Sequence, residues 1–282
     1  MENLKIAFII FEFGAGGQER QVSYALEKFI DKGLKPLLFI WNSDKTNGQN
    51  YGIPVSGTEI IYLQGRFTTK IFQIRSVLIS KKIRLFQSWS ILMNIILFFS
   101  TIYTNIITFG ALRGKLFGFY IDKTKPLNSL KIIIQLIFVK NIICNSQSAL
   151  NDMKKLFKNI PFVKKKVFFL QNRTIIKDSI ISNSDIKKYN SISCGSLLEV
   201  KNIDFIIDVV YSLKNYYPNY THAHAGKNGN MYPELLEKVK FRGLQKNFIF
   251  MGELKNLDGL YSNAELFIHA STNEGVPNVI IE

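Results

Sequence analysis

The feature that most constrains this fold is a repeated alternation of short apolar runs with stretches of helical spacing. Residues 6–11 form a continuous apolar run of strand length, and residues 18–30 then place apolar side chains at helical spacing. The alternation resumes with a second strand pattern at residues 36–41 and continues along the chain. Strands that alternate with helices indicate a doubly wound parallel sheet. We therefore predict the α/β class.

The length of the chain favours two domains. Its 282 residues, 47% of them hydrophobic, are enough for two ordinary α/β domains with separate cores. Residues 173–188 are polar, rich in Ser, Asn and Lys, and without clear periodicity, which is typical of a linker. We predict an N-terminal domain at 1–173 and a C-terminal domain at 174–282.

One stretch invites a membrane-spanning interpretation. Residues 85–112 carry no charge, and about 20 apolar residues span a bilayer. We prefer a buried helix at 91–102 followed by a strand at 105–109, because polar residues interrupt the stretch. Further along, the apolar residues 131–145 predict another strand, and residues 149–158 predict the helix that follows it.

The charge of the chain points to acidic partners. A net charge of +15 and a pI of about 9.6 favour phosphorylated ligands, an anionic membrane surface or nucleic acid. Nucleic acid is the least favoured, because the sequence has no aromatic-basic motif of a known type. Basic residues on both sides of the uncharged stretch suit peripheral attachment to an anionic membrane.

The cysteines and the N-terminus indicate a reducing compartment. Cys144 and Cys194 each lie within an apolar run and lack metal-ligand spacing, so we expect buried thiols. The chain begins directly with a strand pattern rather than an export signal. We predict a cytoplasmic protein that is peripheral on the inner face of the membrane.

The three histidines allow more than one interpretation. His222 and His224 alternate along one strand and face the same side, but a metal site would need further ligands that the neighbouring sequence does not offer. We expect packed or solvated histidines and no metal. His269 lies close to Glu274 in sequence, so it is either an acid, base or sugar contact or an ordinary loop residue.

Glycines follow the first strand. Residues 14–17 read Gly-Ala-Gly-Gly and lead directly into a helix. Glycines there let the backbone approach a ligand while the helix N-terminus faces it, an arrangement that favours phosphate. The spacing is not that of a Rossmann or P-loop motif, so a tight turn explains the glycines equally well.

The end of the chain combines a strand, a polar loop and a helix start. Residues 264–269 suit a buried strand, and Pro277 suits a first helical turn. At a spacing of eight, Glu274 and Glu282 lie on roughly the same side of that helix. Free N–H groups for an anion and carboxylates for sugar hydroxyls together suit a nucleotide sugar. The alternative is a helix start with two solvated acids.

Three segments carry a resemblance to a known family. Residues 271–282 resemble the Ser-x-x-Glu-Gly-x-Pro segment and spaced glutamate pair of the family 4 retaining glycosyltransferases. Residues 16–20 resemble the family's Gly-Gly-x-Glu-Arg segment, and residues 195–202 resemble its Gly-Arg-Leu-x-x-x-Lys-Asn loop. The resemblance implies the GT-B fold, in which two Rossmann-like domains face a cleft.

The resemblance also implies an activity. It implies a hexose moved, with retention, from a nucleotide diphosphate sugar to a glycan or lipid-linked acceptor in surface polysaccharide synthesis. The reaction would need no metal or other cofactor.

Several residues receive implied roles. Lys201 would hold the donor diphosphate, Glu274 the donor sugar near the reacting carbon as the catalytic residue, and Glu282 the ribose hydroxyls. Gly16 and Gly17 would border the cleft on the acceptor side. Arg113 resembles an arginine that follows the next strand in related enzymes and would bind substrate, and its alternative is a solvated loop residue.

The chain departs from the family pattern in three places. Ser196 replaces the arginine of the diphosphate loop, and Ser88 or Ser90 stands where related enzymes carry a histidine. Family members also continue beyond the equivalent of Glu282, so we expect a C-terminally truncated second domain. A second hypothesis is therefore a catalytically impaired, truncated homologue that binds a nucleotide sugar or a partner without turnover.

Overall fold

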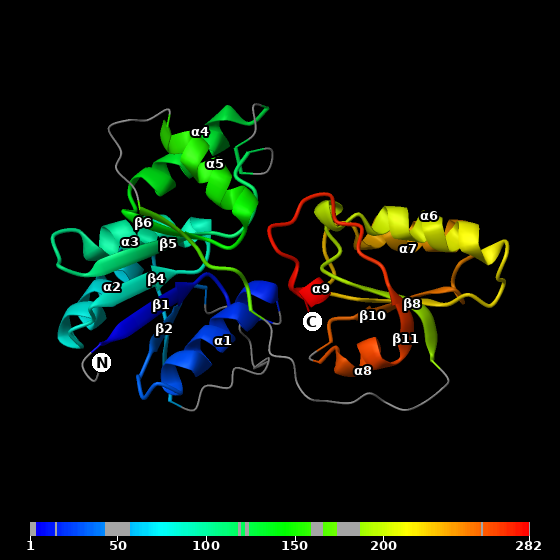
Figure 1. Cartoon of the computed structure of the whole chain (residues 1–282), viewed down its shortest axis with the longest axis horizontal. Helices are drawn as coiled ribbons and strands as arrows, with labels where there is room; N and C mark the ends of the chain where they lie inside the picture. Colours follow the sequence, from blue (N-terminus) through cyan, green and yellow to red (C-terminus); the bar gives the residue numbers. More distant parts are fainter. Residues whose placement is uncertain are drawn as a thin grey trace. The chain divides into compact units, whose positions relative to one another are not determined.

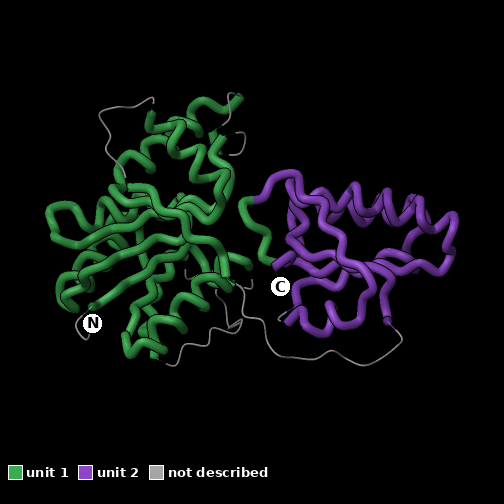
Figure 2. The backbone as a smooth tube through the Cα atoms, viewed as in Figure 1, with its two compact units in different colours: residues 1–174, 275–278 green, residues 175–274, 279–282 purple. Residues whose placement is uncertain are grey.

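The chain forms two compact units. The computed structural model describes residues 4–14, 16–42, 57–117, 120–121, 124–158, 166–173, 187–254 and 256–281. The first unit comprises residues 1–174 and 275–278, and the second comprises residues 175–274 and 279–282 (Figure 2). The division between Thr174 and Ile175 lies in the polar segment singled out as a linker. Residues 275–278 differ from the expectation, because they group with the first unit.

A parallel sheet forms the centre of the first unit (Figure 1). Its strands follow the order β3-β2-β1-β4-β5-β6-β7, and every pairing between them is parallel. The α/β prediction is therefore confirmed for this unit. The strands are β1 (Ile6–Ile10), β2 (Leu37–Ile40), β3 (Glu59–Tyr62), β4 (Leu85–Ser88), β5 (Ile107–Leu112), β6 (Asn141–Cys144) and β7 (Lys166–Phe169).

Helices cover both faces of this sheet. The side chains of β1 alternate between two cores: Phe8 packs with Val22 and Leu26 of α1, whereas Ile9 packs in the core that contains Ile74 of α2 and Ile96 of α3. All five residues of β1 are buried, as expected for a central strand with helices on both sides. The helices are α1 (Gly17–Ile30), α2 (Phe67–Ser80), α3 (Asn94–Thr101), α4 (Pro126–Ile137) and α5 (Gln147–Lys158).

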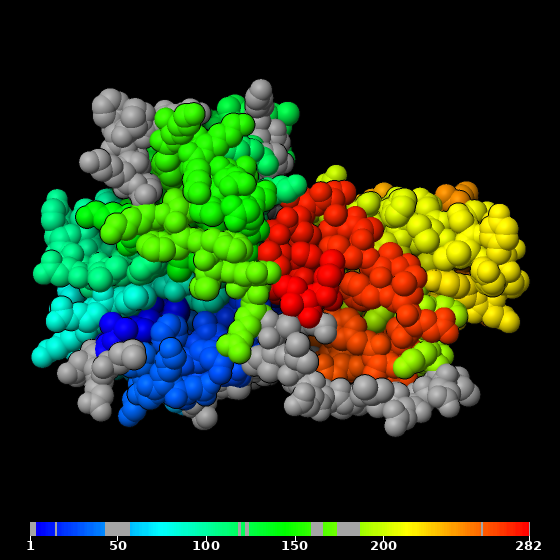
Figure 3. All heavy atoms as spheres, in the orientation of Figure 1, coloured from blue at the N-terminus to red at the C-terminus, as the bar shows by residue number. Residues whose placement is uncertain are grey.

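The predicted strand at residues 131–145 was wrong over its first half. Residues up to Ile137 belong to α4, and only Asn141–Cys144 form a strand. A continuous apolar run has no periodicity that separates a strand from a helix. Pro126 was the missed signal, because it occupies the first turn of the helix. The helices α4 and α5 (green in Figure 3) lie at the surface of the first unit, and Leu127 of α4 is 74% exposed.

The uncharged stretch folds as a strand, a helix and a strand. It supplies β4, a short 3-10 turn η1 (Ile91–Met93), α3 and β5. Within the described part of the chain, no helix is long and apolar enough to cross a membrane. The expectation of a buried helix and a strand is confirmed, since α3 has eight residues and packs in the core.

The second unit holds a smaller parallel sheet. Its strands follow the order β10-β9-β8-β11, and β8 pairs with β9 on one side and β11 on the other. The strands are β8 (Tyr189–Cys194), β9 (His222–Ala225), β10 (Phe248–Gly252) and β11 (Ala264–Phe267). The helices and turns that follow them are η2 (Glu199–Lys201), α6 (Ile203–Lys214), α7 (Tyr232–Phe241), α8 (Asp258–Ser262) and α9 (Asn278–Ile281). Both cysteines of the chain are buried, as expected.

A buried amide joins three elements of the first unit. The Oδ1 atom of Asn94 accepts hydrogen bonds from Ser88 Oγ at 2.6 Å and from the Ala111 N–H at 3.0 Å. Its Nδ2 atom donates to the Ala111 carbonyl at 3.2 Å. Asn94 is fully buried at the start of α3, so this one side chain joins β4, α3 and β5.

We expect Asn94→Leu to destabilise the first unit despite its similar size. The free energy of unfolding should fall by about 2–4 kcal/mol, because Ser88 and both backbone groups of Ala111 lose partners in a buried site. Chemical denaturation measures the change. Ser88→Ala is the matched control and should cost only about 1 kcal/mol, since it removes one donor. An equal loss in both variants would contradict the joining role of Asn94.

Candidate functional site

The order of strands in the second unit contains a topological switch point at β8. From β8 the chain adds β9 and β10 in one direction, and β11 then pairs on the opposite side of β8 (Figure 1). The loops after β8 and β11 therefore start from the ends of two neighbouring strands and lead in different directions. In open α/β sheets, ligands bind at such a topological switch point, beyond the carboxyl ends of the strands.

Two predicted site residues meet at this switch point. Lys201 Nζ donates a hydrogen bond to Glu274 Oε1 in an ion pair, and each side chain is 24% exposed. Lys201 lies in η2, after β8, whereas Glu274 lies in the loop after β11. The two loops also contact each other directly, because the Thr272 N–H donates to the Val200 carbonyl at 3.0 Å. The fold thus brings together a cation and a carboxylate that are 73 residues apart in sequence.

Glycines let the backbone of this site pack closely. Gly195 has a φ of +155°, and a Cβ atom on it would lie 3.3 Å from the side chain of Lys201. A Cβ atom on Gly226, at the end of β9, would lie only 1.8 Å from the Gly195 carbonyl oxygen. Larger residues at either position would displace the loop that carries Lys201.

A histidine adjoins the ion pair. His269 is half-buried, and its Nε2 atom has no hydrogen-bond partner among the described residues. Desolvation lowers the pKa of His269 below its usual value of 6.5, the charge of Glu274 raises it, and the charge of Lys201 lowers it. His269 therefore belongs to the same electrostatic cluster as the two predicted residues.

The first unit has its own switch point, between β1 and β4. Gly16 caps α1, and Gly17 is its first residue, directly after the loop from β1. Asn278 Nδ2 donates to the Gly17 carbonyl at 2.8 Å, and a Cβ atom on Gly17 would lie 2.5 Å from the same nitrogen. Gly17 therefore admits the close approach of another part of the chain.

Sequence reasoning missed the residues that bind Asn278. Asn172 Nδ2 donates to Asn278 Oδ1 at 2.8 Å and to the Val276 carbonyl at 3.3 Å. Gln21 Nε2 also donates to Asn278 Oδ1, at 3.4 Å, and Gln21 is itself held by bonds to the backbone of Arg173. The only local signal was an asparagine after Pro277 within an otherwise apolar run. Its partners are more than 100 residues away, so no sequence spacing indicates them.

Arg113 is a half-buried residue rather than a solvated one. Its guanidinium lies over the ring of Trp89, 3.9 Å from the centroid, and donates to Asn172 Oδ1 at 3.1 Å. Desolvation by burial lowers the pKa of Arg113. This arrangement leaves its Nε atom without a hydrogen-bond partner in the described structure.

Other buried polar atoms without partners lie at the carboxyl ends of neighbouring strands. They are Trp89 Nε1 and Ser90 Oγ after β4, and Asn145 Oδ1 after β6, with Arg113 between them after β5. Such atoms are uncommon in folded proteins, where strain, a catalytic role or a bound water or ion usually explains them. The same ends of parallel strands are where α/β sheets hold their ligands.

The remaining predicted residues have other outcomes. Glu282 lies outside the described residues. Ser88 is buried and bonded to Asn94, so its role is structural, whereas Ser90 belongs to the polar set above. Over the described ranges, no three His, Cys, Asp or Glu side chains are grouped to hold a metal ion.

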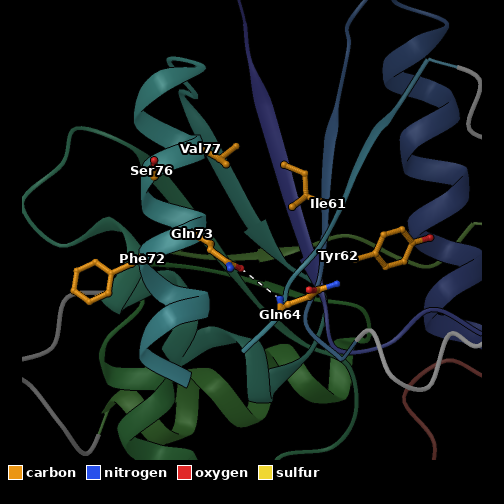
Figure 4. A pocket seen from close by; sticks show the side chains of 7 residues that line it. All are labelled: Ile61, Tyr62, Gln64, Phe72, Gln73, Ser76 and Val77. Atoms are coloured by element: carbon orange, nitrogen blue, oxygen red, sulfur yellow. Dashed lines mark hydrogen bonds between the residues drawn. The ribbon is translucent and has the colours of Figure 1, made fainter. Parts of the chain in front are cut away.

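A surface groove lies elsewhere on the first unit. Figure 4 shows it between the end of β3 and α2, where Gln64 N donates to Gln73 Oε1 at 3.4 Å. Its lining lacks carboxylates, histidines and cations and includes none of the predicted site residues, so we assign no chemistry to it. The lining residues are Ile61, Tyr62, Gln64, Phe72, Gln73, Ser76 and Val77.

Comparison with protein families gives a match over the C-terminal part of the chain. Residues 174–282 match the family described as "Glycosyl transferases group 1". This segment contains both Lys201 and Glu274. The match therefore covers the switch point of the second unit and the ion pair that lies there.

Two curated proteins are similar over parts of the chain. One is an alpha-1,4-N-acetyl-D-galactosaminyltransferase from Campylobacter jejuni, and its full name includes an undecaprenol-linked glycan. This chain is 33% identical to it over 141 residues. The match covers 49% of this chain and 38% of that protein. The other is the GtfA subunit of a Streptococcus agalactiae peptide N-acetylglucosaminyltransferase, 25% identical over 96 residues, with 34% of this chain and 19% of that protein covered. Each match thus spans well under half of the relative's length.

Solved structures match nearly the whole chain. A variant of TarM from S. aureus, in complex with fondaparinux, alpha-GlcNAc-glycerol and UDP, has a TM-score of 0.77 at 10% identity, with 99% of this chain and 83% of that chain covered. HepE from Anabaena, with UDP and glucose, has a TM-score of 0.75 at 18% identity, with coverage of 99% and 77%. These similarities show that the chain has the GT-B fold. The family match adds a similarity to glycosyltransferases over residues 174–282.

The pKa of His269 should report the geometry of the ion pair. We expect a pKa below 6.5 in the native chain, a further decrease in Glu274→Gln and an increase in Lys201→Met, because each substitution removes one opposing charge effect. NMR titration of the imidazole resonances measures the three values. If both substitutions moved the pKa in the same direction, the cluster would not be arranged as described.

Proposed function

We propose that this chain is a retaining glycosyltransferase that moves a hexose from a nucleotide diphosphate sugar to a glycan or lipid-linked acceptor in surface polysaccharide synthesis. The observation that carries the proposal is the Lys201–Glu274 pair at the switch point of the second unit, within the segment that matches a glycosyltransferase family. HepE and the pneumococcal O-GlcNAc transferase GtfA, which share the fold, were both solved with UDP and a sugar.

The donor would use the ion pair in a defined way. A diphosphate needs a cation, and Lys201 is held in the loop after β8 with its charge matched by Glu274. The diphosphate would therefore compete with Glu274 for Lys201. Once released, the Glu274 carboxylate would accept hydrogen bonds from sugar hydroxyls, and Glu282 would bind the ribose. Lys201 would also stabilise charge on the departing nucleotide.

The first unit would contribute the acceptor contacts. We assign the acceptor to the side of Gly16 and Gly17, with Arg113 and its unpartnered polar neighbours as hydrogen-bonding groups. Retention would follow from attack on the same face of the sugar with the donor phosphate as base. That mechanism uses no metal and no separate side-chain base. The matching curated relatives are named as transferases, so binding without turnover is the less favoured alternative.

We further propose that the protein is cytoplasmic and that its first unit attaches to the inner membrane surface. Several large apolar side chains of this unit are exposed, including Phe72 (70%), Tyr103 (95%) and Leu127 (74%). Cationic side chains flank the same elements at Lys81, Lys82 and Arg84. Aromatic groups that enter the interface and cations that attract anionic lipids are the combination used by peripheral proteins.

Opposite effects on nucleotide binding test the donor site. Lys201→Ala should weaken binding of UDP or GDP by about 1–3 kcal/mol, the cost of a lost charged hydrogen bond. Glu274→Gln should strengthen it by on the order of 1 kcal/mol, because the competing carboxylate is removed from a partly exposed pair. Calorimetry measures both, with the exposed Lys240→Ala as the matched control.

A transfer assay then tests turnover. Transfer from a nucleotide sugar should be lost in both Lys201→Ala and Glu274→Gln but retained in Lys240→Ala. Unchanged nucleotide affinity in Lys201→Ala would remove this lysine from the site. Failure of the native chain to bind any nucleoside diphosphate would overturn the proposed function.

Membrane attachment should depend on both salt and exposed aromatic groups. Binding to vesicles that contain anionic lipid should fall as salt rises, because screening weakens the attraction of the cations. Phe72→Ser with Tyr103→Ser should weaken it further at constant salt. The matched control is Tyr216→Ser, at a residue of the second unit that is 79% exposed. Vesicle flotation that is independent of salt and of these residues would contradict the proposal.

A further inference from the structure

A continuous network of hydrogen bonds connects side chains of β8 and β9 and ends at Gly195, where the loop that carries Lys201 begins. The register of these parallel strands pairs Ser191 with His222 and Ser193 with His224. Since side chains alternate along a strand, both serines and both histidines lie on one face of the sheet. All four residues are at most 1% exposed.

The donor–acceptor distances in this network are all short. Ser191 Oγ lies 2.7 Å from His222 Nδ1, and His222 Nε2 lies 2.8 Å from Ser193 Oγ. Ser193 Oγ also lies 2.7 Å from His224 Nδ1, and His224 Nε2 lies 2.9 Å from the Gly195 carbonyl oxygen. Each ring nitrogen of both histidines therefore has one partner.

The hydrogen bond between His224 and the Gly195 carbonyl determines which atom donates in each of the other three bonds. A carbonyl oxygen only accepts, so His224 Nε2 carries the proton and donates it to Gly195. Burial lowers the pKa of His224 to about 4 and that of His222 to about 3, so both rings are neutral near pH 7. His224 Nδ1 must then accept from the Ser193 hydroxyl.

The same reasoning extends to the far end. Because the Ser193 hydroxyl hydrogen is used on His224, its oxygen accepts from His222 Nε2, which therefore carries a proton. His222 Nδ1 then accepts from the Ser191 hydroxyl. All four bonds donate toward Gly195, and both histidines are in the Nε2–H form.

The hydrogen bond to Gly195, at the end of this network, supports the loop that carries Lys201. The Gly195 carbonyl accepts from His224, and the Gly195 N–H donates to the Ala225 carbonyl at 2.9 Å. The side chain of Lys201 lies 3.3 to 3.5 Å from the position that a Cβ atom on Gly195 would occupy. The backbone that β8 presents to Lys201 is thus held on both sides of Gly195.

We propose that His224, oriented through Ser193 by His222, is a positioning residue that fixes the Gly195 peptide and so places Lys201 for an anionic ligand. Its link to a donor diphosphate rests on the proposed function, whereas the proton arrangement does not. A packing role predicts a different dependence on residue type: it would let a leucine replace His224, whereas positioning requires an N–H group at the Nε2 position.

Imidazole NMR of the native chain tests the proton arrangement without any ligand. The chain has three histidines. We expect His222 and His224 to show the Nε2–H form and no titration between about pH 5 and pH 8, whereas His269 serves as the comparison outside the network. An Nδ1–H form at either His222 or His224 would overturn the inference.

Substitutions then separate positioning from packing. Gln can place an N–H near the Nε2 position, whereas Leu fills space without a donor. Without nucleotide, amide hydrogen exchange across residues 195–202 should stay close to native in His224→Gln and rise in His224→Leu. UDP or GDP affinity should fall about tenfold in His224→Leu, the scale of one lost hydrogen bond, and much less in His224→Gln.

Ser193→Ala gives a second measurement if His224→Leu fails to fold. It leaves the His224 ring in place but removes the partner of Nδ1, so we expect a mixture of ring forms and faster exchange in the loop. Native exchange in both His224→Leu and Ser193→Ala would overturn the positioning role. If no variant, the native chain included, binds a nucleoside diphosphate while the exchange pattern holds, the proposed function fails and the positioning role stands.

Discussion

The pairing of β8 with both β9 and β11 is the interaction on which the rest of the second unit depends. It places the loop after β8 beside the loop after β11, which brings Lys201 to Glu274. On its other side, the same strand places Ser193 against His224 and so supports Gly195. One strand therefore carries both the charged site and its support, and a shift of one residue in its register would separate both sets.

The Lys201–Glu274 ion pair suggests where on the chain an anionic ligand binds. A net charge of +15 attracts anions in general, but it selects no ligand. Lys201 differs from the exposed cations because it is partly buried and paired with the carboxylate of Glu274. An anion with attached hydroxyl groups can satisfy both side chains, whereas a bare anion leaves the carboxylate without its partner. This physical difference favours a sugar-linked diphosphate.

Much of the candidate site was predictable because it lies in local motifs. The glycines around residue 16, Lys201 and Glu274 all lie between a strand and the helix that follows it, where the local sequence pattern predicts the position of each residue. The roles of Asn94, Asn172 and Asn278 were not predictable, because their partners are distant in sequence and an amide side chain has no periodic signature. The strand prediction for residues 131–137 was wrong for another reason, because an unbroken apolar run suits either a strand or a helix.

The sequence by itself determined the α/β class, the presence of enough strands for two sheets and the residue types in the loops after the strands. It could do so because periodicity and glycine placement act over only a few neighbouring residues. Only the tertiary structure decided that Lys201 and Glu274 pair, and that His222 and His224 form hydrogen bonds with Ser191 and Ser193. Both outcomes depend on which strands are neighbours and in what register. That choice is made by packing across the whole sheet, so no short stretch of sequence contains it.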